Sequence, residues 1–409
     1  MTAIIVIEPR SSGTALVASA VRLGMATHAY SANRDEPPLS RELLAASVPY
    51  AVVDTDSPNA VAAAASAIGV DAIVPGVPGC EYATGVAAES AALLGLPHLQ
   101  PEAAAPTHDK YRSPMHLAAA GLAVPLFALV VHRRDAMTAA LRVGFLAARK
   151  PVRGGMHGTY VNSLSQLQLA VECAMHHGVV DVGHKTGNVL LLEQYPEGPE
   201  CCIEGYVSSK HGPRVVAVTE NLLSAEQHLA KMGQFAEASL TPDQRAALVT
   251  YVEHAAVQIG LTLAVFHAKV RITRDGPVLI KIAACLGGDR TCRLIELSRS
   301  ISLPEITIRS HLGDPEPAHD ADAKAAVCVS GVRSFAPVVR HRRRRTRSRQ
   351  TRSPGSGGPF SYRPHSATTS GDERPCRHVL CIAPVRPTRD SRLAEALRTP
   401  GSRRACNRI

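Results

Sequence analysis

Short runs of β-branched and other apolar residues alternate with alanine-rich amphipathic stretches over residues 1–105. The predicted strands are Ile4–Ile7, His28–Ser31, Val52–Asp54 and Ala72–Val74, and the predicted helices between them are Thr14–Leu23, Asn59–Ile68 and Glu81–Leu94. Strands that alternate with helices are typical of a parallel sheet covered by helices. We therefore expect an α/β N-terminal domain.

The pattern becomes mixed between Thr107 and Leu312, where strands no longer alternate regularly with helices. The predicted strands are Phe145–Lys150, Val189–Gln194, Ile203–Val207, Arg214–Thr219, His267–Thr273 and Val278–Ala283, and the predicted helices are Ser165–His176 and Pro242–Gly260. Thr241 caps the last helix and Pro242 occupies its first position. This region is predicted to be α+β.

Beyond Ser330 the chain becomes rich in Arg, Ser, Pro and Gly. Residues 331–409 contain 19 Arg, no Lys and four acids, a net charge of +15, so the first 330 residues carry −5 of the total +10. Such a segment buries too little apolar surface to offset its ordering entropy, and we expect a disordered basic tail. A nucleic-acid-binding arm, a merely solvated tail and a frame-shifted reading of a GC-rich gene are the alternative interpretations.

Composition narrows the class of protein. With 409 residues and 45% hydrophobic residues, the chain suits two or three domains. The longest apolar stretch near the middle, Leu117–Val131, contains Pro125 and is shorter than the roughly 20 residues of a membrane-spanning helix. The N-terminus lacks signal-peptide features, so we expect a cytoplasmic protein. No C-x-x-C occurs among the ten cysteines, and the absence of Trp argues against nucleic-acid stacking.

Several segments carry residue types that suit a phosphate ligand. Lysines fixed on strands neutralise phosphates while a Gly-rich loop folds over them. Lys110 opens a helix-like stretch, Lys150 ends a strand, and the Gly-rich segment 153–158 follows directly. The turn Pro9–Gly13 after the first strand either accepts an anion at a helix N-terminus or is a tight turn without a ligand.

Two longer motifs give these segments a context. Residues 198–206, GPECCIEGY, are similar to the motif G-P-E-x-x-V-E-G-Y, and residues 278–289, VLIKIAACLGGD, are similar to V-L-I-E-I-A-A-R-x-G-G-D. Leu294–Leu297 and Leu303–Pro304 fit the helix and turn that follow. Over residues 1 to about 315 the chain resembles the ATP-grasp superfamily, in particular the biotin-carboxylase-like carboxylate–amine ligases, which include amino-acid ligases that make dipeptides.

The resemblance implies a fold and a reaction. The α/β N-terminal domain (1–105) would be followed by α+β ATP-grasp domains, lobe A with a Gly-rich lid (106–187) and lobe B (188–330), and by the disordered basic tail (331–409). The reaction would use ATP to join a small-molecule carboxylate to an amine, with amino acids as the expected substrates and a homodimer as the expected assembly. A membrane or nucleic-acid partner is not expected.

The resemblance also implies roles for residues at matching positions. The implied ATP-binding residues are Lys110, Lys150, Gly154, Gly155, Gly158, Glu193, Gln194, Tyr195, Glu200 and Glu204. The implied catalytic residues are Lys110, Lys150, His267 and Arg290, with Arg293 as a further candidate carboxylate ligand.

The sequence departs from the family at the metal site. Lys269 and Lys281 stand where the family has the two acids that hold magnesium, Cys285 replaces an Arg, and Asn221 replaces an expected Lys. Mg²⁺ requires several oxygen ligands, whereas an ammonium offers none and repels a cation by several kcal/mol. The resemblance thus implies ATP and Mg²⁺ as cofactors, while these two lysines predict that the metal site is lost.

Three interpretations of these departures stand side by side. The lysines could take over phosphate neutralisation, the chain could keep an ATP-binding shell with little or no catalysis, or both the substitutions and the tail could come from a decaying or misread gene. The corresponding functions are an impaired ATP-dependent carboxylate–amine ligase and a non-catalytic ATP-binding protein.

Overall fold

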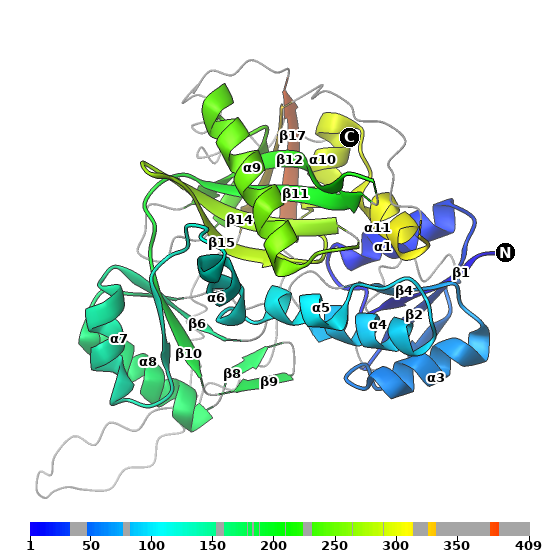
Figure 1. Cartoon of the computed structure of the whole chain (residues 1–409). Coiled ribbons are helices and arrows are strands. Elements are labelled where there is room, and N and C mark those ends of the chain that lie inside the picture. The colour runs from blue at the N-terminus through cyan, green and yellow to red at the C-terminus, as the bar shows by residue number, and fades with distance from the viewer. Residues whose placement is uncertain are drawn as a thin grey trace, which may run out of the picture.

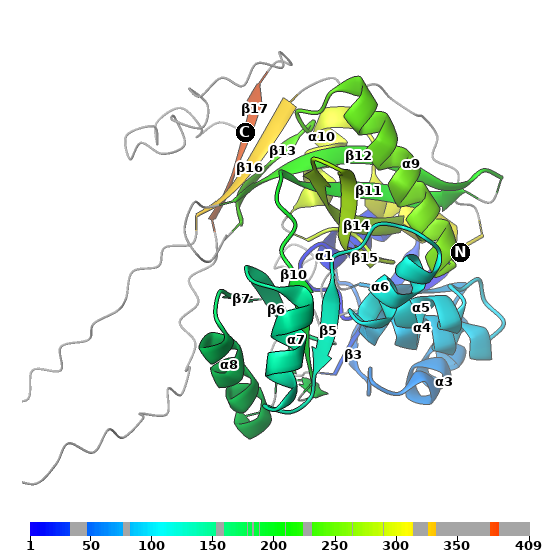
Figure 2. The same ribbon diagram turned by 60° about the vertical axis from the view of Figure 1, so that its left-hand side comes forward.

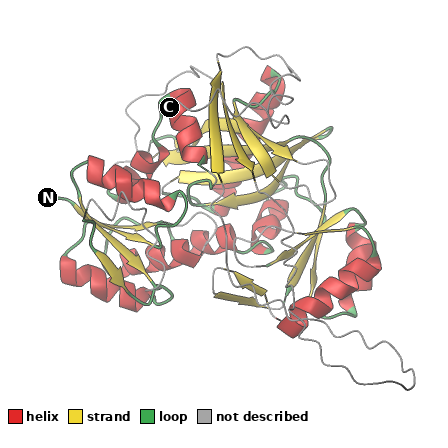
Figure 3. Cartoon of the chain, turned by 180° about the vertical axis from the view of Figure 1, so that it is seen from behind, coloured by secondary structure: helices red, strands yellow, loops and turns green. Residues whose placement is uncertain are grey.

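The computed structural model describes most of the first 313 residues and two strands beyond them (Figure 1). The described residues are 1–32, 47–76, 82–152, 159–177, 179–181, 184–187, 189–208, 210–223, 231–263, 265–288, 290–313, 326–332 and 377–383. They form three sheet-containing bodies, which lie at the corners of a triangle when seen from behind (Figure 3). Within this part of the chain no helix is long and apolar enough to cross a bilayer.

The N-terminal body is a parallel sheet with helices on both faces. Its elements are β1 (Ala3–Ile7), α1 (Gly13–Arg22), β2 (Ala26–Ser31), β3 (Tyr50–Val52), α3 (Pro58–Ile68), β4 (Ala72–Pro75) and α4 (Tyr82–Leu93), and the strand order is β3-β2-β1-β4. Strand β1 is apolar throughout because both of its faces are buried. Ile4 and Val6 pack toward α1, whereas Ile5 and Ile7 pack toward α3 and α4.

The second body is an antiparallel sheet with two helices against it (Figure 2). Helices α5 (Pro101–His108) and α6 (Arg112–Ala119) lead into β5 (Phe127–Val130), α7 (Asp135–Val143), β6 (Ala147–Pro151), β7 (Thr159–Val161), α8 (Leu164–His177), β8 (Val179–Asp181), β9 (His184–Gly187) and β10 (Leu190–Gln194). The main sheet has the order β5-β10-β6-β7. We call this body lobe A.

The third body, lobe B, is a larger antiparallel sheet. It contains β11 (Glu200–Ser208), β12 (Gly212–Leu223), β13 (Lys231–Ala236), α9 (Pro242–Ile259), β14 (Val265–Thr273), β15 (Gly276–Ala283), α10 (Thr291–Arg299), α11 (Leu303–His311), β16 (Ala326–Val332) and β17 (Arg377–Ala383). The strand order is β15-β14-β11-β12-β13-β16-β17. Helix α9 covers the apolar face of this sheet, and it begins with the predicted Thr241 cap, completed by Gln244 into a capping box.

Helix α11 joins the third body to the first. It lies beside α1 (Figure 1), and its Ile306 and Ile308 pack in one core with Leu16 of α1 and Ile4 of β1. The N-terminal sheet therefore obtains part of its cover from a segment about 300 residues away in the sequence. This packing fixes the N-terminal body against lobe B.

The predicted elements are largely present, with some corrections. The strand expected at Val52–Asp54 ends at Val52 and begins at Tyr50. The sequence pattern did not predict several short elements, among them α5, β5, α7, β7 and β13, and it gave α6 only as a helix-like stretch from Lys110. Within the predicted tail, Arg377–Ala383 pairs with β16 as the edge strand β17, and Val379–Ala383 is an apolar run long enough for an edge strand. The rest of the predicted tail beyond Val332 lies outside the described residues.

Burial of His311 makes the stability of the protein sensitive to acid. Its imidazole is 5% exposed at the end of α11, and Nδ1 donates to the Thr307 carbonyl at 2.8 Å. Burial lowers the pKa of His311 from 6.5 to about 4, against the smaller opposite effect of that hydrogen bond. Between these two values the unfolded chain binds the proton and the folded chain does not. The free energy of unfolding should therefore fall by roughly 3 kcal/mol as pH drops from above 6.5 to about 4.

Urea unfolding at several pH values measures this slope. His311→Gln should flatten the dependence of the unfolding free energy on pH between 6.5 and 4, whereas His116→Gln, at an exposed position of α6, should leave it unchanged. Equal slopes in all three proteins would show that His311 is not the group responsible.

Candidate functional site

The two-residue repeat of β11 and β14 separates an apolar from a charged face of the lobe B sheet. Glu200, Cys202 and Glu204 alternate along β11, and their partners across the ladder are Arg271, Lys269 and His267 of β14. The residues between them, such as Cys201 and Ile203, point to the opposite face and pack in the core under α9. We call the side that carries Glu200 and Glu204 the polar face.

The carboxylate of Glu200 gathers three partners on this face. Asn221 Nδ2 donates to Oε1 at 2.7 Å, Lys269 Nζ lies 3.4 Å from Oε1, and an Arg271 guanidinium nitrogen lies 3.1 Å from Oε2. Burial alone would raise the pKa of Glu200, but the charges of Lys269 and Arg271 and the Asn221 hydrogen bond outweigh it and lower the pKa. The same attraction outweighs burial at Lys269 and raises the pKa of its ammonium. Both groups are therefore charged.

Arg271 also connects the sheet to the segment between the lobes. Its guanidinium stacks on the Tyr195 ring at 4.6 Å from the centroid and donates to the Gly198 carbonyl at 2.7 Å. Tyr195 in turn packs edge-on against Tyr160 of lobe A, with the ring centroids 5.1 Å apart. Burial raises the pKa of Tyr160 to about 12, so both rings stay neutral. The sequence analysis did not single out Arg271. A charged residue between Val270 and Ile272 of a buried strand would have indicated that its side chain has a specific partner.

Lobe A and lobe B share a cleft that contains several predicted site residues. Its lining includes Asp109, Lys110, Glu193 and Lys281. Glu193, which is 4% exposed, is paired with Lys150 Nζ from the neighbouring strand. The backbone N–H of Lys110 donates to the Val152 carbonyl at 2.9 Å, which holds Lys110 at the end of β6. Lys110, Lys281 and Glu193 therefore line one space, and Lys150 lies beside it as the partner of Glu193.

At the other end of the polar face lies a buried acid–imidazole pair. His267 Nδ1 lies 2.5 Å from Oε1 of Glu204, whose side chain is fully buried. Within the described residues, Glu204 Oε2 has no hydrogen-bond partner. Gly287 packs directly over the pair, because a Cβ at this position would stand 2.4 Å from Glu204 Oε1 and 3.0 Å from His267 Nδ1.

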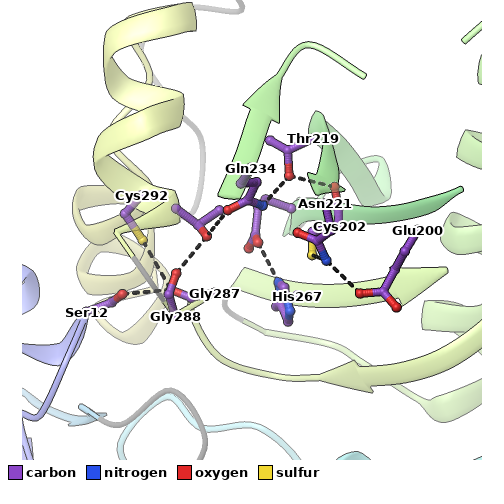
Figure 4. A network of polar contacts seen from close by, with 12 residues as sticks. Ser12, Glu200, Cys202, Thr219, Asn221, Gln234, His267, Gly287, Gly288 and Cys292 are labelled. Atoms are coloured by element: carbon purple, nitrogen blue, oxygen red, sulfur yellow. Dashed lines mark hydrogen bonds and ion pairs between the residues drawn. The ribbon is translucent and has the colours of Figure 1, made fainter. Parts of the chain in front are cut away.

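Polar contacts link the loop that packs over this pair to the N-terminal body (Figure 4). Ser12, which precedes α1, donates its hydroxyl to the Gly287 carbonyl at 2.7 Å. On the lobe B side, Gln234 donates to Thr219, and the Thr291 hydroxyl lies within hydrogen-bonding distance of both Gln234 Oε1 and the Gly288 carbonyl. The Pro9–Gly13 turn thus contacts protein backbone through Ser12.

The remaining predicted site residues are either exposed at the surface or outside the described residues. Gln194 is exposed, and its side-chain oxygen accepts from the Leu126 N–H at 3.5 Å. Arg290 is exposed at the start of α10, and Arg293 forms a 2.8 Å ion pair with Glu296 on the surface. Gly154, Gly155 and Gly158 lie outside the described residues.

The residues present do not fit a magnesium ion. Lys269 and Lys281 face each other across β14 and β15. Nowhere in the described ranges do three or more His, Cys, Asp or Glu side chains gather as metal ligands. An ammonium group supplies no oxygen ligand and repels a divalent cation placed near it.

Part of the chain is similar in sequence to a known domain family and to one known protein. The sequence profile of the ATP-grasp domain matches residues 156–293. An uncharacterized protein of Sinorhizobium fredii, y4rH, is 25% identical over 320 residues, which make up 76% of this chain and 64% of that relative. The chain thus spans less than two thirds of the length of the curated relative that it matches.

Solved structures share the fold at low sequence identity. The L-amino acid ligase of Bacillus licheniformis superposes with a TM-score of 0.66 at 17% identity, covering 81% of this chain and 80% of the ligase. Carboxyaminoimidazole ribonucleotide synthase of Aspergillus clavatus, complexed with ATP, gives 0.66 at 16% identity and covers 81% and 82%. The biotin carboxylase domain of Hydrogenobacter thermophilus 2-oxoglutarate carboxylase, in complex with MgADP, ADP and bicarbonate, gives 0.65 at 17% and covers 80% and 74%.

The close packing of Gly287 over the Glu204–His267 pair is testable with a matched pair of variants. Gly287→Ala should lower the free energy of unfolding by about 1–3 kcal/mol, because the buried carboxylate has no room to retreat from the new methyl group. At Gly288 a Cβ would meet nothing within 4 Å, so Gly288→Ala should change stability by less than about 0.5 kcal/mol. Denaturant unfolding of both variants measures the difference, and equal effects would contradict the packing described.

Proposed function

We propose that this chain, which has the ATP-grasp fold, binds ATP in the cleft between its two lobes and uses it to join a carboxylate to an amine. The observation that carries the proposal is that Lys110, Glu193 and Lys281 line one cleft, with Lys150 paired to Glu193 beside it. These residues come from both lobes, so the cleft exists only because the lobes face each other. The fold relatives include ligases and an ATP complex, which supports this reaction class.

Each part of the cleft suits a part of the nucleotide. Lys150 is 12% exposed beside Glu193, so its ammonium is held close to one position rather than moving freely in water. Together with Lys110 it would neutralise phosphate oxygens, which bind strongly to charged donors. Glu193 and Tyr195, at the end of β10, would line the side on which the base lies.

The proposed reaction has two steps. A carboxylate oxygen of the substrate attacks the terminal phosphorus of ATP, and the bond between that phosphorus and the bridging oxygen breaks. ADP departs, and the substrate carboxylate has become an acyl phosphate. The amine nitrogen then attacks the acyl carbon, inorganic phosphate leaves with its bonding electron pair, and the amine gives up a proton. Positioning and charge stabilisation by the chain's own cations would supply most of the catalysis.

His267 is the side chain that we propose takes that proton. Glu204 fixes its Nδ1, so the ring presents Nε2 as the proton acceptor, and the buried carboxylate would stabilise the imidazolium that forms. Amino acids are the proposed carboxylate and amine substrates, since the chain shares its fold with an L-amino acid ligase.

A second candidate function is favoured by one observation. Lys269 and Lys281 oppose each other on the polar face, in a site whose residues do not fit magnesium. Phosphoryl transfer normally depends on a metal that orients and activates the phosphate. A non-catalytic ATP-binding protein on the same fold is therefore the alternative to a ligase.

Calorimetric titration with ATP tests the proposed site. Lys150→Met should weaken ATP binding about tenfold or more, because a charge-assisted contact is worth about 1.5–3 kcal/mol. Lys210→Met, on the exposed turn between β11 and β12, is the matched control and should bind as the unmodified chain does. Circular dichroism of both variants checks that removing the partner of Glu193 leaves the fold intact.

Turnover separates the two candidate functions. Release of ADP that depends on an added pair of amino acids supports the ligase, and ATP binding without such release supports the non-catalytic protein. If the unmodified chain fails to bind ATP under any condition, both are wrong.

A further inference from the structure

Lys269 and Lys281 form a cross-strand pair of like charges on the polar face. They are direct partners in the β14–β15 ladder, and both are half-buried. Like charges in this relation destabilise a sheet unless something compensates them. Lys269 has its 3.4 Å contact with Glu200, and Lys281 lines the cleft that also contains Lys110. The pair therefore extends the positive charge of the cleft onto lobe B.

The carboxylates around this pair are already occupied by internal partners. Glu200 accepts from Asn221 through Oε1 and faces Lys269 and Arg271, and Glu193 is paired with Lys150. Glu200 and Glu193 are thus each paired with at least one cation, three cations in all.

Asp109, the acid that lines the cleft beside Lys110, is also engaged. Its Oδ1 accepts from the N–H groups of Tyr111 and Arg112 at 3.0 Å each, and so caps the start of α6. Its Oδ2 lies 3.8 Å from Arg112 Nε. None of these three acids offers the set of free oxygens that a hard divalent cation requires.

We propose that this site takes its nucleotide as the free polyphosphate anion, without a divalent cation, and that Lys269 and Lys281 bind the phosphates. The inference rests on the proposed function, since it concerns the ATP site itself. A divalent cation bound to a triphosphate cancels two of its negative charges and demands oxygen ligands from the protein. Glu200, Glu193 and Asp109 are engaged by lysine, arginine and backbone or side-chain amide groups, so free ATP complements this cleft better than the magnesium complex does.

Titration of the full chain with ATP, once in EDTA and once in excess Mg²⁺ at matched ionic strength, tests the proposal. ATP should bind at least tenfold more tightly in EDTA than in Mg²⁺, and the affinity in EDTA should fall steeply with added salt, because the contacts are ionic. Binding that needs Mg²⁺ would overturn this inference and leave the proposed function standing. Absence of binding in both buffers would instead overturn the proposed function.

A variant of the cross-strand pair tests whether Lys281 contributes to the binding of ATP in EDTA. Lys281→Gln should weaken ATP binding in EDTA about tenfold, whereas Lys210→Gln, on the exposed turn, should leave it unchanged. Unchanged binding by Lys281→Gln would show that this lysine does not contact phosphate and would overturn the proposal. Thermal unfolding of each variant confirms that a loss of affinity does not come from a loss of fold.

The double variant Lys269→Glu, Lys281→Glu provides the converse measurement. It places two carboxylates on adjacent strands where the chain has two ammonium groups. Binding of Mn²⁺ in the presence of ADP, followed by electron paramagnetic resonance, should appear in this variant and be absent in the unmodified chain. Tight Mn²⁺ binding by the unmodified chain with ADP would contradict the proposal directly.

Discussion

The alternation of side chains along β11 and β14 is the constraint on which the rest of this structure depends. Because successive residues point to opposite faces, the same strands build the core under α9 and the polar face of the cleft. Glu200 and Arg271 lie on one side, while Cys201 and Val270 are buried on the other. A slip of one residue would bury the charges and expose the core, so the register of this ladder is strongly specified.

The charge balance of the cleft follows from that register. Two buried acids are placed opposite cations of the same face or of the neighbouring strand: Glu200 meets Arg271 and Lys269, and Glu193 meets Lys150. Breaking one such pair leaves a buried charge uncompensated and costs several kcal/mol. These ion pairs therefore fix the positions of the lysine side chains of the site as well as balancing their charge. Because the acids are already paired, the cleft is suited to an anionic ligand.

The sequence predicted the parts of this arrangement that local pattern controls. The continuous apolar run of β1, the Thr241 cap and the nearness of Lys150 to Glu193 all follow from periodicity, capping chemistry or motif resemblance. It did not predict the Arg271–Tyr195 stack or the packing of α11 on the N-terminal sheet, because these depend on how separated segments meet in space. Short elements such as α5 and β5 were missed because a few residues show little periodicity.

The contact between Ser12 and Gly287 has a consequence for how the site is assembled. The hydroxyl of Ser12 holds the carbonyl of a glycine whose α-carbon packs against the Glu204–His267 pair, 275 positions farther along the chain. The orientation of His267 is thus set jointly by lobe B, which supplies the pair, and by the N-terminal body, which fixes the backbone above it. Because α11 docks on the same body beside α1, the two contacts reinforce each other. The two lobes alone would leave the loop over His267 without its anchor, so the N-terminal body is a structural part of the site.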